Sequence, residues 1–473
     1  MIQQLTNVRP FTSIRHWIDT HWLWLMRVAI IVGVLLVSAA LGTHPRLLYL
    51  VGLGGLAGVV LFMMSPGLGL LLTLLAGMVV PFYGPSGVGL TQAGLALLLG
   101  LWLADILVVD KEIRWHPSPT NLPAMLIVAS MLLSFIVGKL PWYRTAQAPL
   151  QAQLGGISVY LFSVATYFLV GNRIKDVRWL EWISWIFVGL AWFRILGWLF
   201  PAFGRLFTEK LYAEGTLGSL FYLWLACIPL GQALFNTQLK KWQRALLFLI
   251  VATTLYVEAG PAYDWKSGWM PAAAGVAVIV VLRFSRLIPL MALLGAVPVV
   301  QSISEAMLTD RYSYSTRLDA WSIVFQIVKV NPITGLGPAN YYWYTPLFPI
   351  RGYAVNFNSH SQYVDMIAQT GILGLIIFFV FMWQVGRLAW SLRKRVPEGF
   401  ARGYVYSAIG GIVGSLVASW LGDWLLPFVY NVGLHGFRAS ILSWIFLGGL
   451  LLLDRCYPAE LAENEVGQEE RNA

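Results

Sequence analysis

The chain has 473 residues, of which 58% are hydrophobic and only 11% are charged, and its mean hydropathy is +0.69. A soluble globular chain carries roughly 25% charged residues, so this composition excludes that class. Continuous apolar runs recur along the chain, and about 20 such residues cross a bilayer as a helix. Because the runs are continuous rather than alternating, they exclude a transmembrane β-barrel and predict an all-α, polytopic membrane protein.

The net charge is +10, a value that would raise nucleic acid as a partner if the protein were soluble. Here the lysines and arginines lie mainly in short loops between apolar runs, where they set the orientation of the helices. We therefore expect the lipid bilayer as a partner and no nucleic acid. The two cysteines, Cys227 and Cys456, are isolated and match neither a disulfide framework nor a zinc-binding pattern.

Windowed hydropathy predicts about 12–14 transmembrane helices. The apolar runs cover residues 22–42, 47–64, 67–83, 88–109, 121–140, 154–171, 179–200, 216–235, 245–260, 268–284, 287–300, 362–390, 404–426 and 432–453. The first run also resembles a signal peptide, but its length and the spans that follow at once favour a retained anchor. We expect an N-terminal bundle over residues 1–301, an external loop over 302–361, C-terminal helices over 362–455 and a disordered cytoplasmic tail over 456–473.

Lysine and arginine are distributed unequally between alternate loops. The richer set contains Arg9/Arg15, Lys111/Arg114, Arg173/Lys175/Arg178, Lys240/Lys241/Arg244, Arg283/Arg286 and Arg393/Lys394/Arg395. Because positively charged loops favour the cytosol, this set and both termini are predicted to be cytoplasmic. The long loop over residues 302–361 then lies on the outer side of the membrane.

The long loop is expected to contain an amphipathic helix over residues 316–330, capped by Ser315 or Thr316 and ended by Pro332. Its apolar face is predicted to consist of Leu318, Trp321, Phe325 and Val328. A glycine-rich turn follows, and aromatic residues then crowd the stretch 341–357. Those aromatics fit either an interfacial belt or stacking against sugar rings.

His360 lies where this loop meets the next apolar span. A lone histidine is more often a cap or an interfacial residue, yet imidazole titrates near neutral pH and suits general-base catalysis. Arg311, Arg317 and Arg351 lie in the same loop, and guanidinium groups bind diphosphate through paired hydrogen bonds. This combination favours a lipid-diphosphate substrate over a metal site.

The sequence around this histidine resembles that of a known family. After the candidate base the chain reads His360-Ser361, nine residues, and Gly371-Ile-Leu-Gly374. Before it the chain reads Arg317-x-x-x-Trp321 and Asn331-Pro332-x-x-Gly335-x-Gly337. Both stretches are similar to the pattern of bacterial O-antigen ligases and Wzy-type polymerases, and the resemblance covers residues 256–375.

The resemblance implies a GT-C-like fold in the bacterial plasma membrane that works without a metal or another cofactor. It implies transfer of a glycan from undecaprenyl diphosphate to a hydroxyl of a glycolipid or glycan acceptor on the external, periplasmic face. In this family a histidine is held to deprotonate the acceptor and arginines to bind the diphosphate, which makes His360 and Arg317 the candidates. A second family arginine falls at Lys266, where lysine keeps the charge but loses the fork geometry. Further candidates for substrate binding are Arg311, Arg351, Arg144, Arg194 and Tyr363.

Three alternatives remain open at this stage. An enzyme that uses the same donor with a different acceptor, either a polysaccharide polymerase or a transferase that modifies protein, is not separated from a ligase by the sequence. A transporter of a small anion or solute fits the many spans, but the large external loop and the lack of evident inverted repeats argue against it. A membrane scaffold would leave the histidine and the clustered cations without a role.

Overall fold

The computed structural model describes residues 58–80, 88–111, 115–200, 216–260, 266–289 and 311–458, together with the isolated residues 28, 32, 55 and 204. The predicted spans over residues 22–42 and 287–300 and the predicted tail lie largely or wholly outside the described residues. Within the described part every regular element is a helix, and an isolated bridge pairs Ile350 with Tyr353.

The chain divides into two compact units, the first comprising residues 1–72 and 94–115 and the second comprising residues 73–93 and 116–473. Helices α3 (Pro66–Val79) and α4 (Leu90–Ala104) each contribute residues to both units. In the first unit α4 continues into the π-helical turn η2 (Asp105–Asp110). The second unit holds all later helices and is the part relevant to function.

The helices of the second unit begin with α5 (Asn121–Val137), α6 (Leu150–Arg173), α7 (Val177–Leu199), α9 (Ser219–Phe235), α10 (Lys241–Ala259) and α11 (Lys266–Arg283). After the short turn η3 (Ser285–Leu287) come α13 (Arg311–Val328), α14 (Asn340–Tyr344), η4 (Thr345–Leu347), α15 (Gln362–Arg395), α16 (Phe400–Leu421) and α17 (Phe437–Cys456). Among the described residues, seven helices are long and apolar enough to cross a membrane, and three shorter apolar helices accompany them. The prediction of an all-α, polytopic membrane protein is therefore confirmed.

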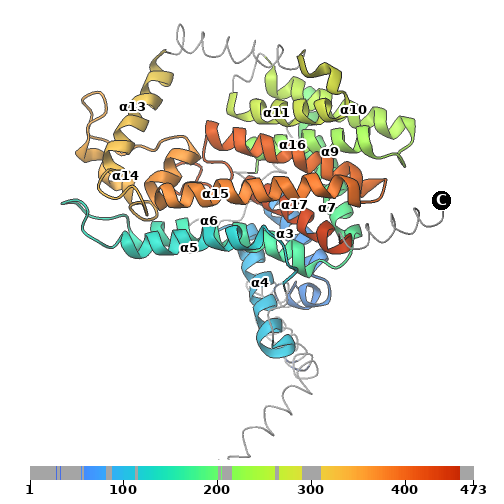
Figure 1. The fold of residues 1–473 in the computed structure, drawn as a ribbon, viewed down its shortest axis with the longest axis horizontal. Helices are drawn as coiled ribbons and strands as arrows, with labels where there is room; N and C mark the ends of the chain where they lie inside the picture. The colour runs from blue at the N-terminus through green and yellow to red at the C-terminus, as the bar shows by residue number, and fades with distance from the viewer. Residues whose placement is uncertain are drawn as a thin grey trace, which may run out of the picture. The chain divides into compact units, whose positions relative to one another are not determined.

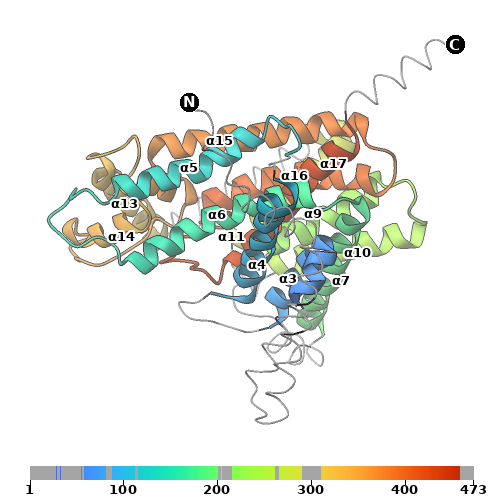
Figure 2. The ribbon, with the colours of Figure 1, turned by 90° about the horizontal axis from the view of Figure 1, so that it is seen from below.

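Helix α17 forms the centre of the second unit. The apolar segment of this helix is buried along its whole length. The helix packs against α6, α9, α15 and α16 (Figures 1 and 2). The hydrophobic effect does not drive helices together inside a bilayer, because lipid tails are as apolar as leucine. Close packing of helix surfaces must therefore supply much of the stability of this bundle.

Helices α11 and α16 show how that close packing is achieved. A Cβ atom on Gly410 would lie 2.7 Å from the carbonyl oxygen of Gly275, and one on Gly275 would lie 2.9 Å from the carbonyl oxygen of Gly410. Each glycine thus lets the other backbone approach, as small residues do at helix interfaces in membranes. No larger residue fits at either position without moving a helix.

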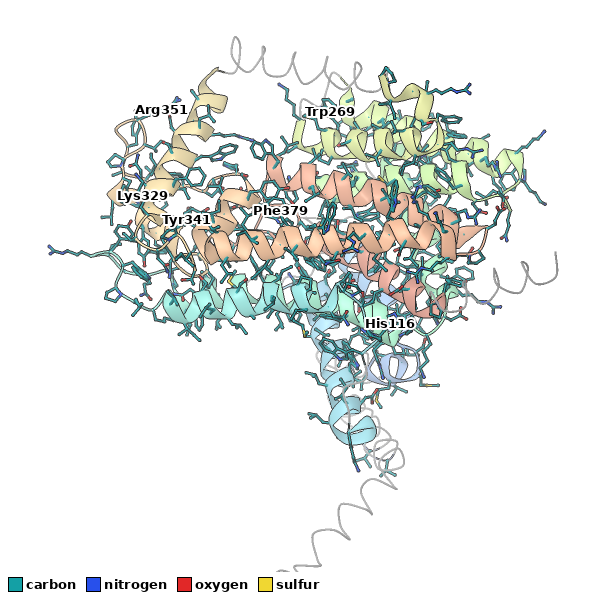
Figure 3. The ribbon with its side chains drawn as sticks, in the orientation of Figure 1. His116, Trp269, Lys329, Tyr341, Arg351 and Phe379 are labelled. Carbon is teal, nitrogen blue, oxygen red and sulfur yellow. The ribbon has the colours of Figure 1, made fainter. Side chains whose placement is uncertain are left out.

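Several loops of the richer basic set meet at one end of the bundle in the described part of the chain. Arg455 at the end of α17 donates to the carbonyl oxygen of Asn172 at 2.5 Å, and Arg395 at the end of α15 lies 2.7 Å from Asp454. His116, labelled in Figure 3, contacts the same carboxylate at 3.0 Å. A further side-chain hydrogen bond of 2.9 Å joins the loop between α9 and α10 to the loop between α15 and α16. This grouping of loops agrees with the unequal distribution of lysine and arginine between alternate loops of the sequence.

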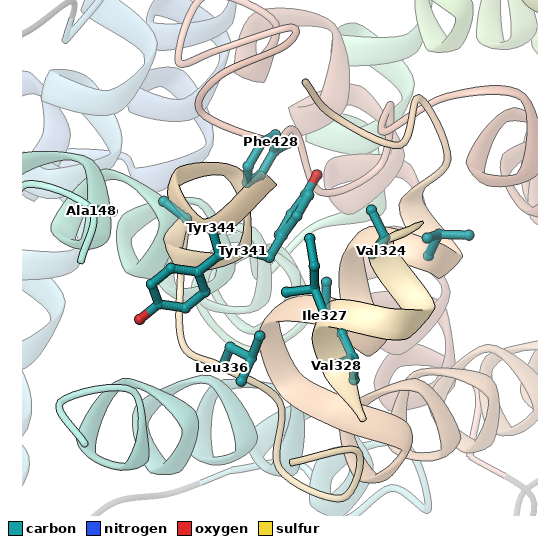
Figure 4. Close-up of a cluster of buried hydrophobic side chains, with 11 residues drawn as sticks. Ala148, Val324, Ile327, Val328, Leu336, Tyr341, Tyr344 and Phe428 are labelled. Atoms are coloured by element: carbon teal, nitrogen blue, oxygen red, sulfur yellow. The ribbon is translucent and has the colours of Figure 1, made fainter. Parts of the chain in front are cut away.

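Helix α13 differs from expectation at its start and on its buried face. It begins at Arg311, so Ser315 and Thr316 lie inside the helix and the predicted cap is wrong. Leu318 and Phe325 remain 44% and 43% exposed. The residues that pack into the core are Ala320, Val324, Ile327 and Val328. Figure 4 shows the last three against side chains of α14 and the loops around it. The predicted apolar face is correct at Trp321 and Val328, which pack in this cluster, and wrong at Leu318 and Phe325, because the neighbours of α13 cover a different side of the helix.

Replacing Gly410 with leucine should destabilise the protein, because the new side chain must push α11 away from α16. Overpacking of this kind typically costs about 1–3 kcal/mol. The matched control is Gly386→Leu on α15, where a Cβ atom meets nothing within 4 Å. The melting temperature of each purified variant in detergent is the measurement, and equal values for the two would contradict the close contact between α11 and α16.

Candidate active site

Helix α15 is broken at Gly371, where φ is +72° and ψ is −177°. That backbone conformation is open almost only to glycine. Residues 362–370 therefore form a short helix that starts two residues after His360, and the long apolar part of α15 follows the break. A break within a membrane-spanning helix frees backbone groups that need new hydrogen-bond partners.

The glycine-rich turn at residues 331–337 supplies these partners. On the C-terminal side of the break, the amide of Ile372 donates to the carbonyl of Pro332 at 2.9 Å, and the next amide donates to the next carbonyl at 3.1 Å. On the N-terminal side, the amide of Leu336 donates to the carbonyl of Ala368 at 2.9 Å, and the following pair repeats the contact at 3.1 Å. The turn and the broken helix thus complete each other's hydrogen bonding.

This contact explains why both sequence motifs require glycine. A Cβ atom on Gly371 would overlap the carbonyl oxygen of Ile333, and one on Gly335 would lie 2.5 Å from the carbonyl oxygen of Gln369. Gly335 and Gly371 both have a φ of +72°. The two glycine motifs recognised in the sequence are therefore the two sides of one backbone contact.

Asn340 holds the same turn from the other side. Its side chain is fully buried, and its Nδ2 donates to the carbonyl oxygens of Leu336 at 2.8 Å and Gly138 at 3.1 Å. Its Oδ1 accepts a hydrogen bond of 3.0 Å from the amide of Ala148. The glycine-rich turn is thus fixed to the loop between α5 and α6 as well as to α15.

His360 lies in a tight turn that links this framework to α13. Its φ of +49° is uncommon for a residue with a side chain. The Ser359 hydroxyl accepts a hydrogen bond of 3.1 Å from the amide of Ser361 and lies 2.8 Å from the carbonyl oxygen of the same residue. The indole N–H of Trp321 donates to the carbonyl oxygen of Ser359 at 2.8 Å. Helix α13 is therefore tied to the residue that directly precedes His360.

Arg317 lies one helical turn before Trp321 and shares its side of α13. Partial desolvation and then the positive charge of Arg317 lower the pKa of His360 from its usual value of 6.5. The imidazole is exposed, so it can meet a substrate, and the lowered pKa favours the neutral form that accepts a proton. The two strongest candidates from the sequence are thus brought within electrostatic range of each other.

A buried carboxylate lies behind this turn. Asp365 is only 2% exposed; its Oδ1 accepts a hydrogen bond from the hydroxyl of Tyr341 and lies 2.8 Å from Oγ of Ser359. The ring of Tyr341 stacks on Phe428 at 5.1 Å between centroids. The sequence pointed to no role for Asp365, and it placed Tyr341 only among the aromatic residues of the stretch 341–357; the available signal for Asp365 was its position in the first turn of the helix that follows His360.

Two other candidates from the sequence are occupied by protein contacts. Arg351 forms a salt bridge of 2.8 Å with Asp319 of α13 and a hydrogen bond with Ser315, so it braces the turn at residues 350–353. Tyr363 donates its hydroxyl to the carbonyl oxygen of Leu416 at 2.7 Å and lies between α15 and α16. Their predicted binding of substrate stays a prediction.

The remaining candidates occupy other elements. Lys266 opens α11, which packs beside α16, whereas α13 and α14 lie at one end of α15 (Figure 1). Arg194 of α7 places its guanidinium 5.8 Å from the ring of Trp198. Arg144 is exposed in the loop between α5 and α6. The side chain of Arg311 lies outside the described residues.

Among the described residues, no group of three or more His, Cys, Asp or Glu side chains could hold a metal ion.

Residues 211–379 match the family model of the O-antigen ligases. This stretch contains His360, Arg317 and Lys266, and it ends just beyond the break in α15. The chain carries an O-antigen ligase domain. The match confirms the resemblance seen in the sequence, while no curated protein matches the chain. The match and the apolar helices support a multi-pass bacterial membrane protein of polysaccharide biosynthesis with glycan transfer of the O-antigen ligase kind.

Replacing Gly371 with alanine should loosen the contact between the glycine-rich turn and α15, because the methyl group overlaps a backbone oxygen. Gly352→Ala is the matched control: its φ is +86°, but a Cβ atom there meets nothing within 4 Å. Both variants place alanine at positive φ, where a side chain is strained at a cost of about 1–3 kcal/mol. Amide hydrogen exchange over residues 331–337 should therefore accelerate in Gly371→Ala only, and equal exchange in both would contradict the contact.

Proposed function

We propose that the domain transfers a glycan from undecaprenyl diphosphate to an acceptor hydroxyl on the outer face of the plasma membrane. The observation that carries this proposal is the hydrogen bond from Trp321 to Ser359, which brings the charge of Arg317 and the imidazole of His360 together within an O-antigen ligase domain. A neutral, exposed base beside a cation suits a reaction in which an alcohol attacks and a diphosphate leaves.

In the proposed reaction the acceptor oxygen attacks the anomeric carbon of the glycan. A glycosidic bond forms while the bond from the anomeric carbon to the diphosphate oxygen breaks, and undecaprenyl diphosphate leaves with the electron pair. His360 takes the hydroxyl proton and later releases it to water. Arg317, with Lys266 as a second cation, stabilises the negative charge that grows on the diphosphate, a role suited to cations held in place before the reaction.

The placement of the reaction on the outer face rests on the direction of α15. That helix starts beside His360 and ends at Arg393, Lys394 and Arg395 in a basic loop. Basic loops favour the cytosol, so the opposite end of the helix is assigned to the external, periplasmic side. The same argument assigns both termini to the cytoplasm and residues 302–361 to an external loop subdomain.

A ligase and a polymerase would share this donor and differ in the acceptor. A ligase transfers the finished polymer to a lipid-anchored glycan, whereas a polymerase transfers the growing chain to the next repeat unit. In a strain that lacks the gene, long polymer retained on the carrier lipid indicates a ligase, and the loss of long polymer indicates a polymerase.

Replacing His360 with alanine should abolish glycan transfer, because the attacking hydroxyl then loses its proton acceptor. Binding of the lipid diphosphate should persist, since the cations remain. The matched control is His435→Ala in the loop between α16 and α17, a half-buried histidine with no role in the proposed reaction. Glycan profiles of a deletion strain carrying each variant test this, and normal transfer by His360→Ala would refute the proposal.

The pH dependence of kcat/KM should report the proton affinity of His360 in the free enzyme. Because desolvation and Arg317 lower that pKa from 6.5, activity should rise with pH below 6.5 and then level off. In Arg317→Gln the positive charge that disfavours protonation of His360 is gone, so the pKa of His360 rises. The pH range over which kcat/KM increases then moves to higher pH. The measurement is kcat/KM for glycan transfer against pH with purified wild type and Arg317→Gln. The same pH dependence in both would contradict the electrostatic link between Arg317 and His360.

A further inference from the structure

We propose that Asp365 is a positioning residue that holds His360 in its reactive orientation. This inference rests on the proposed function, in which His360 is the base. Asp365 itself is too deeply buried to touch an acceptor, whereas His360 is exposed. The aspartate therefore acts through the residues that flank the histidine.

The burial of Asp365 is costly, which points to a specific task. A buried carboxylate loses its hydration and needs hydrogen bonds in compensation. Its Oδ1 has two neighbouring hydroxyls, those of Tyr341 and Ser359, but among the described residues its Oδ2 meets no hydrogen-bond partner. An apolar residue would fill this place at lower cost, so packing alone does not explain the aspartate.

The link to His360 runs through Ser359. The Ser359 hydroxyl has one proton, and its oxygen lies 2.8 Å from both the carboxylate of Asp365 and the carbonyl oxygen of Ser361. The amide of Asp365 also donates to the carbonyl oxygen of Ser361 at 2.9 Å. Both neighbours of the histidine are thus anchored to the same aspartate, through its side chain and its backbone.

This anchoring has a conformational purpose. His360 has a φ of +49°, and a residue with a side chain adopts such a conformation only where its surroundings enforce it. Trp321 fixes the Ser359 carbonyl from α13, and Asp365 fixes the Ser359 hydroxyl from α15. Without the second anchor the turn can relax, and the imidazole then moves away from the acceptor.

The network extends to two further elements. Asp423, in the loop between α16 and α17, lies within electrostatic range of Asp365 and accepts a hydrogen bond of 2.6 Å from the amide of Phe428. The ring of Phe428 in turn stacks on Tyr341. Tyr160 of α6 also lies within electrostatic range of Asp365. The position of the carboxylate is therefore determined by α6, α14, α15 and the loop before α17.

Three variants test the role of the network: Asp365→Leu, Asp365→Asn and Tyr341→Phe. The leucine variant removes the acceptor oxygen and should lower kcat by about 100-fold, the loss that small misplacements of a catalytic group can cause. The asparagine variant keeps an acceptor oxygen for both hydroxyls and should retain most of the activity. Tyr341→Phe removes one donor while keeping the ring, so it tests the network even if the leucine variant fails to fold.

Tyr344→Phe is the matched control for Tyr341→Phe. Both tyrosines are buried in α14, but Figure 4 shows their hydroxyl groups pointing to opposite sides. Only Tyr341→Phe should lower kcat. The assay uses purified full-length protein, undecaprenyl-diphosphate-linked glycan extracted from the deletion strain, and the acceptor from the same cells. The KM for the donor should stay unchanged, since the cations that bind the diphosphate are not altered.

The outcomes separate this inference from the proposed function. If His360→Ala is inactive while Asp365→Leu and Tyr341→Phe keep the wild-type kcat, the positioning role is wrong and the proposed function stands. An asparagine variant as inactive as the leucine variant also overturns it, because charge rather than geometry would then be required. If His360→Ala retains transfer, the proposed function itself fails.

Discussion

The site depends on the backbone contact between the glycine-rich turn and the broken start of α15. Hydrogen bonds from Leu336 on one side of the break and to Pro332 on the other hold two chain segments against each other. Because Gly335 and Gly371 have no side chains, the two backbones can approach closely enough to form them. The short helix after His360 can therefore end inside the protein without leaving backbone groups unpaired.

The same framework explains how a charged and a titratable group from separate helices come together. The ridge of α13 that carries Trp321 also carries Arg317, and the indole reaches the residue before His360. Helix α13 thus supplies both the hydrogen bond that fixes the turn before His360 and the positive charge beside it. The charge lowers the proton affinity of the imidazole, which keeps the base neutral, and it also offers a binding partner for an anionic leaving group.

The helical fold and the two main candidate residues could be predicted from the sequence, because the signals for them lie in short stretches of the chain. Apolar runs mark the helices, and motif spacing pointed to His360 and Arg317, which the fold brings together. The buried face of α13 could not be predicted, since it depends on which neighbours cover the helix: Leu318 and Phe325 belong to the apolar stripe, yet Val324 and Ile327 are buried. The salt bridge of Arg351 and the break at Gly371 likewise depend on segments that are distant in sequence.

The site separates the group that reacts from the groups that hold it. A base must reach its substrate, so His360 is exposed, and exposure alone would leave its side chain and turn free to move. Asp365, Tyr341 and Asn340 are buried, where hydrogen bonds are protected from competing water and are stronger than at the surface. Placing the polar anchors in the interior and the imidazole at the surface therefore combines access for the acceptor with a fixed orientation. The lowered pKa of His360 fits this arrangement, because partial desolvation and a nearby cation act on a group that remains accessible.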